Sequence, residues 1–164
     1  MDSTVQDRIN EQIKHELDSA YIYLAMTAHF EAENLPGFAH WMRLQAREEV
    51  GHAMRLFDYV NDRGGRVTLR ALDEPASRFD APISVFRAAL EHERHITGLI
   101  HELYQLAVEK RDFATQAQLQ WFITEQVEEE KSASTIVEQL EMAGDSRAAL
   151  LYLDRQLGAR AADD

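Results

Sequence analysis

The sequence predicts an all-α fold, namely a four-helix bundle with one long crossover connection and a short fifth helix. Three observations support this prediction. Apolar residues recur with helical periodicity over most of the 164 residues. Only 3 prolines and 7 glycines interrupt the chain, which favours a few long helices over many short strands. One long irregular stretch separates two pairs of helical segments, as a bundle with a single crossover requires.

The first two helices are expected over residues 4–33 and 36–62. Ser3 is expected to cap the first helix, because a serine hydroxyl accepts a hydrogen bond from the free amides of the first turn. The sequence NLPG breaks the periodicity after residue 33, and its proline suits the first turn of the second helix. The paired glycines Gly64 and Gly65 end that helix.

Three further helices are expected over residues 83–109, 113–142 and 146–157, separated by the short breaks KRD and AGD. The irregular stretch RVTLRALDEPASRFDAP precedes the first of them. Fully extended, this stretch reaches about 55 Å, whereas a helix of about 27 residues is only ~40 Å long. The stretch can therefore cross the whole bundle, and we expect one domain over residues 1–164.

Composition excludes several classes of protein. The net charge is −12, with 29 acidic against 17 basic residues, which argues against nucleic-acid binding and suits a protein that handles cations. The chain has no cysteine, which removes disulfides, thiolate zinc sites and iron–sulfur clusters. It shows neither an apolar signal segment at the N-terminus nor a stretch long enough to span a membrane. We expect a cytoplasmic protein with no nucleic-acid or membrane partner.

Polar residues interrupt the apolar stripe of every long helix near its middle. The stripe of the first helix runs Ile9, Ile13, Glu16, Ala20 and Leu24. In helix order, the interruptions are Glu16, then Glu49 with His52, then Glu93, and then Gln126 with Glu129. Because mid-helix positions meet at one level whichever way each helix runs, these side chains are expected to converge in the centre of the bundle.

Four carboxylates in one buried place require a counter-charge. A lone buried carboxylate is strongly unfavourable unless it is paired or bound to a cation, and the four stripes carry no lysine or arginine. Two divalent cations would balance the carboxylates and accept oxygen and imidazole ligands. Glutamates from separate helices combined with Glu-x-x-His pairs form the carboxylate-bridged di-iron arrangement, and Glu49 with His52 supplies one such pair.

At these residues the chain resembles the ferritin family, specifically the bacterial non-haem ferritins. The matching motifs are NEQIKHELDSAYIY at 10–23, QAREEVGHAMRLFDYV at 45–60, EHERHIT at 91–97 and QWFITEQVEEEK at 120–131. The resemblance implies a ferritin-like four-helix bundle and a hollow shell of 24 subunits. It also implies a ferroxidase that oxidises Fe(II) with dioxygen or hydrogen peroxide and stores Fe(III) as a mineral. Leu150, Leu153 and Leu157 of the fifth helix would line the four-fold axes of that shell.

The same resemblance implies a role for each site residue. Glu16, Glu49 and His52 would bind the first iron, with Glu49 bridging to a second iron held by Glu93 and Glu129, close to Gln126. Tyr23 matches a tyrosine beside the centre that donates an electron or a hydrogen bond. A third iron site further inward would use Glu48, Glu125 and Glu128 and share Glu129. Trp121 matches a tryptophan near the centre, where we expect an ordinary packing role.

Haem is not expected. The haem-containing bacterioferritins carry a methionine just after the bridging glutamate, where this chain has Val50. They also repeat Glu-x-x-His on the fourth helix, where this chain has Gln126-Val127-Glu128-Glu129. Because the second iron lacks an imidazole here, we expect it to be held loosely and passed onward.

Two other functions remain open at this point. A mini-ferritin of the Dps type would protect DNA from iron and peroxide, but the acidic balance and the fifth helix argue against it. Its iron sites also lie between subunits, whereas the present ligands complete a site within one chain. The second alternative is a non-catalytic helical scaffold whose polar interruptions form a hydrogen-bond network. It predicts no iron-dependent oxygen uptake.

Overall fold

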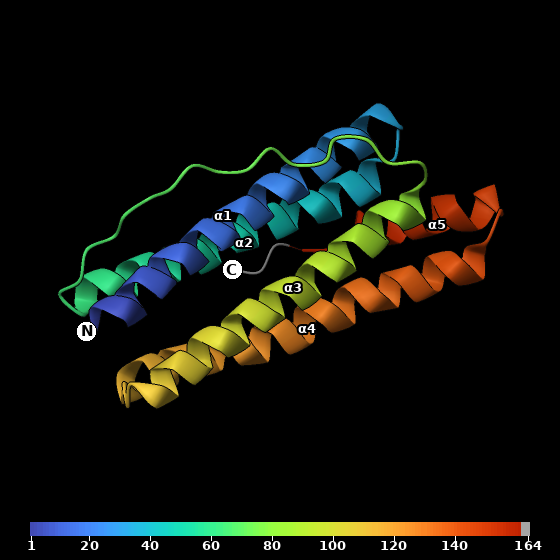
Figure 1. Ribbon diagram of the computed structural model, residues 1–164. Coiled ribbons are helices and arrows are strands. Elements are labelled where there is room, and N and C mark those ends of the chain that lie inside the picture. The colour runs from blue at the N-terminus through green and yellow to red at the C-terminus, as the bar shows by residue number, and fades with distance from the viewer. Residues whose placement is uncertain (162–164) are drawn as a thin grey trace.

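The computed structural model describes residues 1–161 and contains five helices but no strand in this part of the chain (Figure 1). The helices are α1 (Ser3–Ala32), α2 (Pro36–Asp62), α3 (Pro82–Glu109), α4 (Phe113–Ala143) and α5 (Arg147–Leu157). These bounds differ from the expected ones by no more than one residue, and the all-α prediction is confirmed. Within the described residues, no helix is both long and apolar enough to span a membrane.

The expected N-cap of α1 is wrong by one residue. Asp2 rather than Ser3 caps the helix, and its side chain accepts hydrogen bonds from the backbone nitrogens of Thr4 and Val5. An aspartate carboxylate satisfies the free amides as a serine hydroxyl does, and its negative charge also suits the positive end of the helix dipole.

The bundle consists of two helix pairs. α1 packs against α2 and α3 packs against α4, while α1 also contacts α3. The short turn within each pair makes its helices antiparallel (Figure 1). Gly64 and Gly144, which follow α2 and α4, adopt positive φ angles of 66° and 50°. Glycine tolerates these angles because it has no Cβ.

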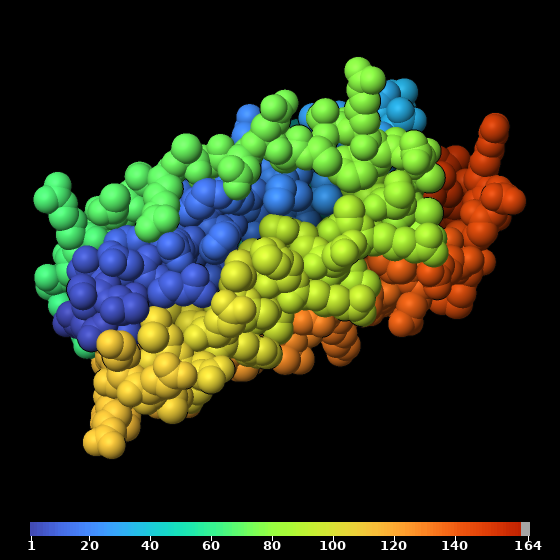
Figure 2. Space-filling view, viewed as in Figure 1, coloured from blue at the N-terminus to red at the C-terminus, as the bar shows by residue number. Residues whose placement is uncertain are grey.

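The long crossover links the two pairs and lies along the outer surface of α1 (Figures 1 and 2). Asn10 of α1 donates to the carbonyl of Arg66 at 3.1 Å and accepts from the nitrogen of Thr68 at 3.2 Å. Further along, Asp18 accepts from the backbone nitrogen of Asp73 at 3.0 Å. Side chains of α1 thus satisfy backbone groups that have no sheet or helix partner, and the crossover brings α3 alongside α1.

The apolar core is divided into two clusters. One contains Phe30, Phe38 and Phe86 and extends to α5. The other, toward the opposite end of the bundle, contains Ile9 and Leu56. The mid-helix polar side chains lie between them, so the interrupted stripes of the sequence correspond to a break in the core itself.

One expected core position is wrong. Leu24 is 49% exposed, whereas its neighbour Tyr23 is fully buried. The buried face of α1 continues from Ala20 through Tyr23 to Thr27, at the spacing of three and four residues that keeps side chains on one helix face. Tyr23 thereby takes the position in the bundle that periodicity alone assigned to Leu24.

The short helix α5 packs against α2 and α4 of its own chain. Leu153 is buried in the first cluster, and Leu150 and Leu157 pack against it. The bundle therefore covers Leu153, whereas Leu150 and Leu157 are only partly buried, and the lining of a four-fold axis by this side of α5 stays a prediction. The large apolar side chains that α5 leaves exposed are Leu151 and Tyr152.

α5 also caps the start of α2. Leu35 at the N-cap position of α2 provides no side-chain hydrogen bond. Instead, the buried Asp154 of α5 accepts from the backbone nitrogen of Phe38 at 2.9 Å. The approach is close, because a Cβ added to Gly37 would lie 1.6 Å from the carbonyl oxygen of Asp154. Gly37 is thus required for α5 to dock.

Replacing Gly37 with alanine is expected to displace α5 and lower the stability of the chain by about 2 kcal/mol or more, the cost of overpacking a close contact. Gly98→Ala is the matched control, since an added Cβ there meets nothing within 4 Å; this change is expected to stabilise α3 by about 1 kcal/mol through helix propensity. Thermal unfolding and limited proteolysis of α5 measure both effects. A Gly37→Ala protein as stable and protease-resistant as the wild type would contradict this account of the contact.

Candidate metal centre

The mid-helix polar side chains meet between the two apolar clusters. We call the five residues Glu16, Glu49, His52, Glu93 and Glu129 the buried belt. α1, α3 and α4 each contribute one carboxylate, and α2 contributes a carboxylate and an imidazole. Every member is 7% exposed or less. The four helices therefore place four carboxylates and one imidazole in a space that water scarcely reaches.

The belt contains a compact group of possible metal ligands. Nδ1 of His52 lies 3.3 Å from a carboxylate oxygen of Glu49 and 3.9 Å from one of Glu16. One ligand atom from each of these three residues lies within 4.8 Å of the other two. Such a spacing allows one cation to contact all three, and oxygen and imidazole ligands suit divalent transition metals.

A second group lies beside the first. It consists of His52, Glu125 and Glu129, whose ligand atoms also lie within 4.8 Å of one another. The residue that the two groups share is His52, whereas the resemblance assigned the bridging position to Glu49. Glu125, which was expected only at a third site, belongs to this second group. The structure thus offers two adjacent cation positions that use different carboxylates.

Glu93 belongs to neither group, and neighbouring side chains hold its carboxylate. The hydroxyl of the buried Tyr23 donates a hydrogen bond to one oxygen of Glu93. Nε2 of Gln126 donates to the other oxygen at 3.1 Å and to the backbone carbonyl of Glu93 at 3.2 Å. Gln126 therefore orients Glu93 through its amide nitrogen. The amide oxygen of Gln126 is the atom that it could still offer to a metal.

Neutral amides support the carboxylates of three belt residues. The pairs are Gln12 Nε2 with Glu16 Oε1 at 2.8 Å, Gln45 Nε2 with Glu129 Oε2 at 2.7 Å, and Gln126 Nε2 with Glu93 Oε2 at 3.1 Å. Among the residues that the structure describes, no ion pair formed by a lysine or arginine involves a belt carboxylate. Neutral donors orient a carboxylate without cancelling its charge, so the negative charge remains available to a cation.

The roles of Gln12 and Gln45 were not predicted from the sequence. Gln12 lies one helical turn before Glu16 on the same face of α1, and this i,i+4 spacing could have identified it. Gln45 instead reaches across the bundle from α2 to Glu129 on α4. No spacing within α2 reveals that contact.

Burial shifts the proton equilibria of the belt. It raises the pKa of Glu93 to about 7, although Tyr23 and Gln126 counteract it, and the pKa of Glu129 to about 8. Burial also raises the pKa of Glu16, and it raises that of Glu49 well above the usual range, with the surrounding carboxylates adding to the rise. A metal ion must therefore displace protons from the belt at neutral pH, which makes binding tighter as the pH rises.

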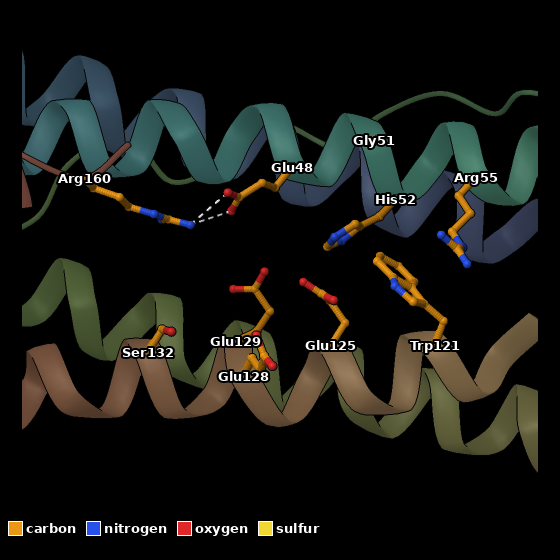
Figure 3. A pocket seen from close by; sticks show the side chains of 10 residues that line it. All are labelled: Glu48, Gly51, His52, Arg55, Trp121, Glu125, Glu128, Glu129, Ser132 and Arg160. Atoms are coloured by element: carbon orange, nitrogen blue, oxygen red, sulfur yellow. Dashed lines mark hydrogen bonds and ion pairs between the residues drawn. The ribbon is translucent and has the colours of Figure 1, made fainter. Parts of the chain in front are cut away.

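A pocket of about 420 Å³ opens from the belt between α2 and α4 (Figure 3). It is lined by His52 and Glu129 and by the three residues of the predicted third site, Glu48, Glu125 and Glu128. Glu128 is exposed, whereas Glu48 and Glu125 are partly buried. The structure thus brings the third-site carboxylates to one opening next to the belt.

Two arginines lie at opposite ends of this pocket (Figure 3). Arg55 stacks over the ring of Trp121, with its guanidinium carbon 4.1 Å from the ring centroid. Trp121 in turn lies edge-on to His52 at a centroid distance of 5.3 Å. At the other end, Arg160 donates to both carboxylate oxygens of Glu48, at 2.8 and 2.9 Å. Nothing in the sequence indicated that Arg160 reaches this site.

Comparison with known proteins shows similarity over nearly the whole chain. A family model described as ferritin-like domain matches residues 6–143. A bacterial non-heme ferritin of Bacteroides fragilis (strain 638R) is 43% identical over 156 residues, covering 95% of this chain and 97% of that protein. A bacterial non-heme ferritin of Staphylococcus aureus (strain USA300) is 35% identical over 158 residues, with coverage of 96% and 95%.

Solved structures give the same result for the fold. An engineered closed form of the Archaeoglobus fulgidus ferritin superimposes with a TM-score of 0.98 at 47% identity, covering 99% of each chain. An open-pore ferritin from the same archaeon gives a TM-score of 0.97 at 46% identity, covering 98% of this chain and 99% of that one. All five residues of the buried belt lie within the range that the family model matches.

Proposed function

This chain belongs to the ferritin family, and on that basis we propose that it binds Fe(II) at the buried belt, oxidises it and stores the Fe(III) product. The family membership and the acidic, cysteine-free composition both suit iron storage. The oxidation of Fe(II) by this chain and the role of each ligand are what we propose. Dioxygen or hydrogen peroxide would accept the electrons.

The observation that carries the proposal is the set of four buried carboxylates, three of which accept hydrogen bonds from neutral donors and none of which, among the described residues, pairs with a lysine or arginine. Their burial is costly unless a cation compensates the charge, and Gln12, Gln45, Gln126 and Tyr23 supply hydrogen bonds without charge. Carboxylate oxygens and imidazole nitrogen suit Fe(II), and carboxylates in particular favour the harder Fe(III). Oxidation therefore strengthens the interactions that the belt provides.

Two adjacent metal positions suit a two-electron reaction. Glu16, Glu49 and His52 would bind one iron. Glu129, the belt carboxylate of the second ligand group, would bind the second iron together with Glu93, which lies in neither group. Each Fe(II) gives up one electron, so a pair can deliver two electrons to one molecule of oxidant. Tyr23 and Gln126 hold Glu93 by hydrogen bonds. The metals displace protons from the belt carboxylates, and these protons are released to solvent.

The pocket between α2 and α4 offers the product a way out of the belt. Glu125 already shares a ligand group with His52 and Glu129, and Glu48 and Glu128 line the same opening. We propose that these three carboxylates form the third iron position. Iron leaving the belt would pass them before it joins the mineral.

We further propose that the chain assembles into a hollow shell of 24 subunits. A single chain leaves many large apolar side chains exposed, among them Phe113, Val127, Met142 and Tyr152, and exposed apolar surface of this kind is typical of subunit interfaces. The mini-ferritin alternative is not favoured, because the relatives that match nearly the whole chain are named non-heme ferritins. A particle with about half the subunit count would contradict the larger shell.

Anaerobic titration with Fe(II), followed by a pulse of oxygen, tests the activity. We expect roughly two to three Fe(II) per chain to be oxidised in a fast first phase, since paired metal positions accelerate the reaction. Slower oxidation of further iron should follow as the mineral grows. Stopped-flow absorbance of Fe(III) and an oxygen electrode measure both phases. The non-catalytic scaffold predicts no iron-dependent oxygen uptake, and that outcome would overturn the proposal.

A further inference from the structure

The residues that follow α5 lie along the first turns of α2, and the side chain of Arg160 reaches into the pocket beside the belt (Figure 3). One guanidinium nitrogen donates to both carboxylate oxygens of Glu48, at 2.8 and 2.9 Å. Another donates to the side-chain oxygen of Gln45. Arg160 lies beyond residues 6–143, which the family model matches.

Several contacts fix Arg160 in this position. Nε2 of His40 donates to its backbone carbonyl at 2.9 Å, and its guanidinium lies 5.2 Å from the ring centroid of Trp41. Its side chain is only 25% exposed. Just before it, a Cβ added to Gly158 would lie 3.1 Å from Cα of Gly37. The docking of α5 on α2 thus determines where this arginine enters the pocket.

Arg160 bonds to a carboxylate that the proposed third iron position requires. A guanidinium that donates to both oxygens of one carboxylate uses the directions in which a metal ion would also bind. The pocket contains four carboxylates, those of Glu48, Glu125, Glu128 and Glu129. Arg160 supplies positive charge at the end of the pocket where Glu48 lies (Figure 3).

A hydrogen-bonded path connects Arg160 to the belt. The side-chain oxygen of Gln45 accepts from Arg160, and its side-chain nitrogen donates to Glu129 at 2.7 Å. An amide cannot exchange these two ends without losing both bonds. Arg160 therefore also keeps Gln45 in the orientation that supports Glu129.

We propose that the Arg160 guanidinium and a metal cation bind Glu48 alternately, so that Arg160 must leave Glu48 before the third position holds a metal. This inference rests on the proposed function, because it concerns the third iron position of that site. Arg160 acts as a permanent cation that competes with iron there. The competition keeps the affinity of the third position low, so that iron moves on from the belt and is not retained beside it.

Calorimetric titration of the assembled, metal-free protein with Zn²⁺ tests the inference without redox chemistry. Arg160→Gln removes the charge but keeps a polar side chain of similar reach. We expect the third Zn²⁺ per chain to bind about tenfold more tightly in this variant, because the competing cation is gone. Arg160→Lys retains a cation at the same place and should give a smaller gain.

Arg155→Gln is the matched control, because it removes an equal charge from the exposed surface of α5. It is expected to leave the third affinity at the wild-type value. An unchanged or weaker third affinity in Arg160→Gln would overturn the inference, since Arg160 would then be neutral or would orient Glu48 for the metal. If the wild type lacks two tight Zn²⁺ positions per chain, the proposed function fails instead, so the two failures are distinguishable.

Crystals of the wild-type protein give a second test that needs no variant. Soaking in rising concentrations of Zn²⁺ should produce an anomalous peak beside Glu48 only as the Arg160 side chain moves away from it. Zn²⁺ bound to Glu48 while both hydrogen bonds from Arg160 persist would overturn the inference.

Discussion

Replacing Glu49 and His52 together by alanine is expected to abolish the fast phase of Fe(II) oxidation. The double variant removes two of the three residues in one ligand group and the histidine that both groups share. Loss of residues that merely support a metal ligand costs about 10-fold to 100-fold, so loss of two ligands is expected to cost at least about 100-fold in initial rate. Stopped-flow measurement of Fe(III) formation after anaerobic loading at roughly two irons per chain gives this rate directly.

The double variant His101→Ala, Glu102→Ala is the matched control. It makes the same two chemical changes at exposed positions of α3, and its fast phase is expected to equal that of the wild type. Circular dichroism and particle sizing should show that both variants fold and assemble. A Glu49→Ala, His52→Ala protein that folds and retains the fast phase would show that oxidation occurs elsewhere.

The metal-free protein is expected to lose stability as the pH rises from 6.5 to 9. The pKa of Glu129 is about 8 and that of Glu93 about 7 in the folded chain, against an ordinary value of 4.5 for each. Over this range the unfolded chain has already released both protons, whereas the folded chain still holds them at the lower end. The folded state thus binds more protons, and its stability falls with pH. One pKa unit corresponds to ~1.4 kcal/mol, so Glu129 alone contributes a loss of about 2 kcal/mol.

The lower limit of this window follows from two histidines outside the belt. Burial lowers the pKa of His92 to about 4 and also lowers that of His15, from an ordinary value of 6.5. Below pH 6.5 the unfolded state binds more protons at these histidines, so their contribution to stability is lost as the pH falls. Above about pH 7.5 these histidines are neutral in both states, and the slope from there to pH 9 reports the belt carboxylates.

Chemical denaturation of metal-free protein at pH 6.5, 7.5 and 9 measures the slope. Glu129→Gln is expected to flatten it and to raise the stability at pH 9 by about 2 kcal/mol, since its amide oxygen can still accept from Gln45. Glu91→Gln changes an exposed carboxylate of α3 and should leave the slope as in the wild type.

Saturating Zn²⁺ should restore stability at pH 9, because it binds only the folded belt. Stability that rises with pH in the wild type would contradict the proton assignment.

The sequence by itself determined the helices and the composition of the belt. Apolar periodicity and the breaks at NLPG, Gly64 and Gly144 are local signals, which is why the helix bounds agree to within one residue. Glu16, Glu49, His52, Glu93 and Glu129 were also identifiable, because a polar residue in an apolar stripe is visible along a single helix. Their convergence followed from the equal lengths of the four helices and needed no knowledge of how the helices rotate.

The tertiary structure decided every contact that joins distant parts of the chain. The rotation of α1 placed Tyr23 rather than Leu24 in the core, and the docking of α5 made Asp154 the cap of α2. The bonds from Gln45 to Glu129 and from Arg160 to Glu48 have the same origin. Periodicity indicates which face of a helix is apolar, but it does not indicate which residue of another element lies opposite that face. That pairing depends on the packing of all the helices together. It determined which groups support the belt carboxylates and that Arg160 bonds to Glu48 in the pocket beside the belt.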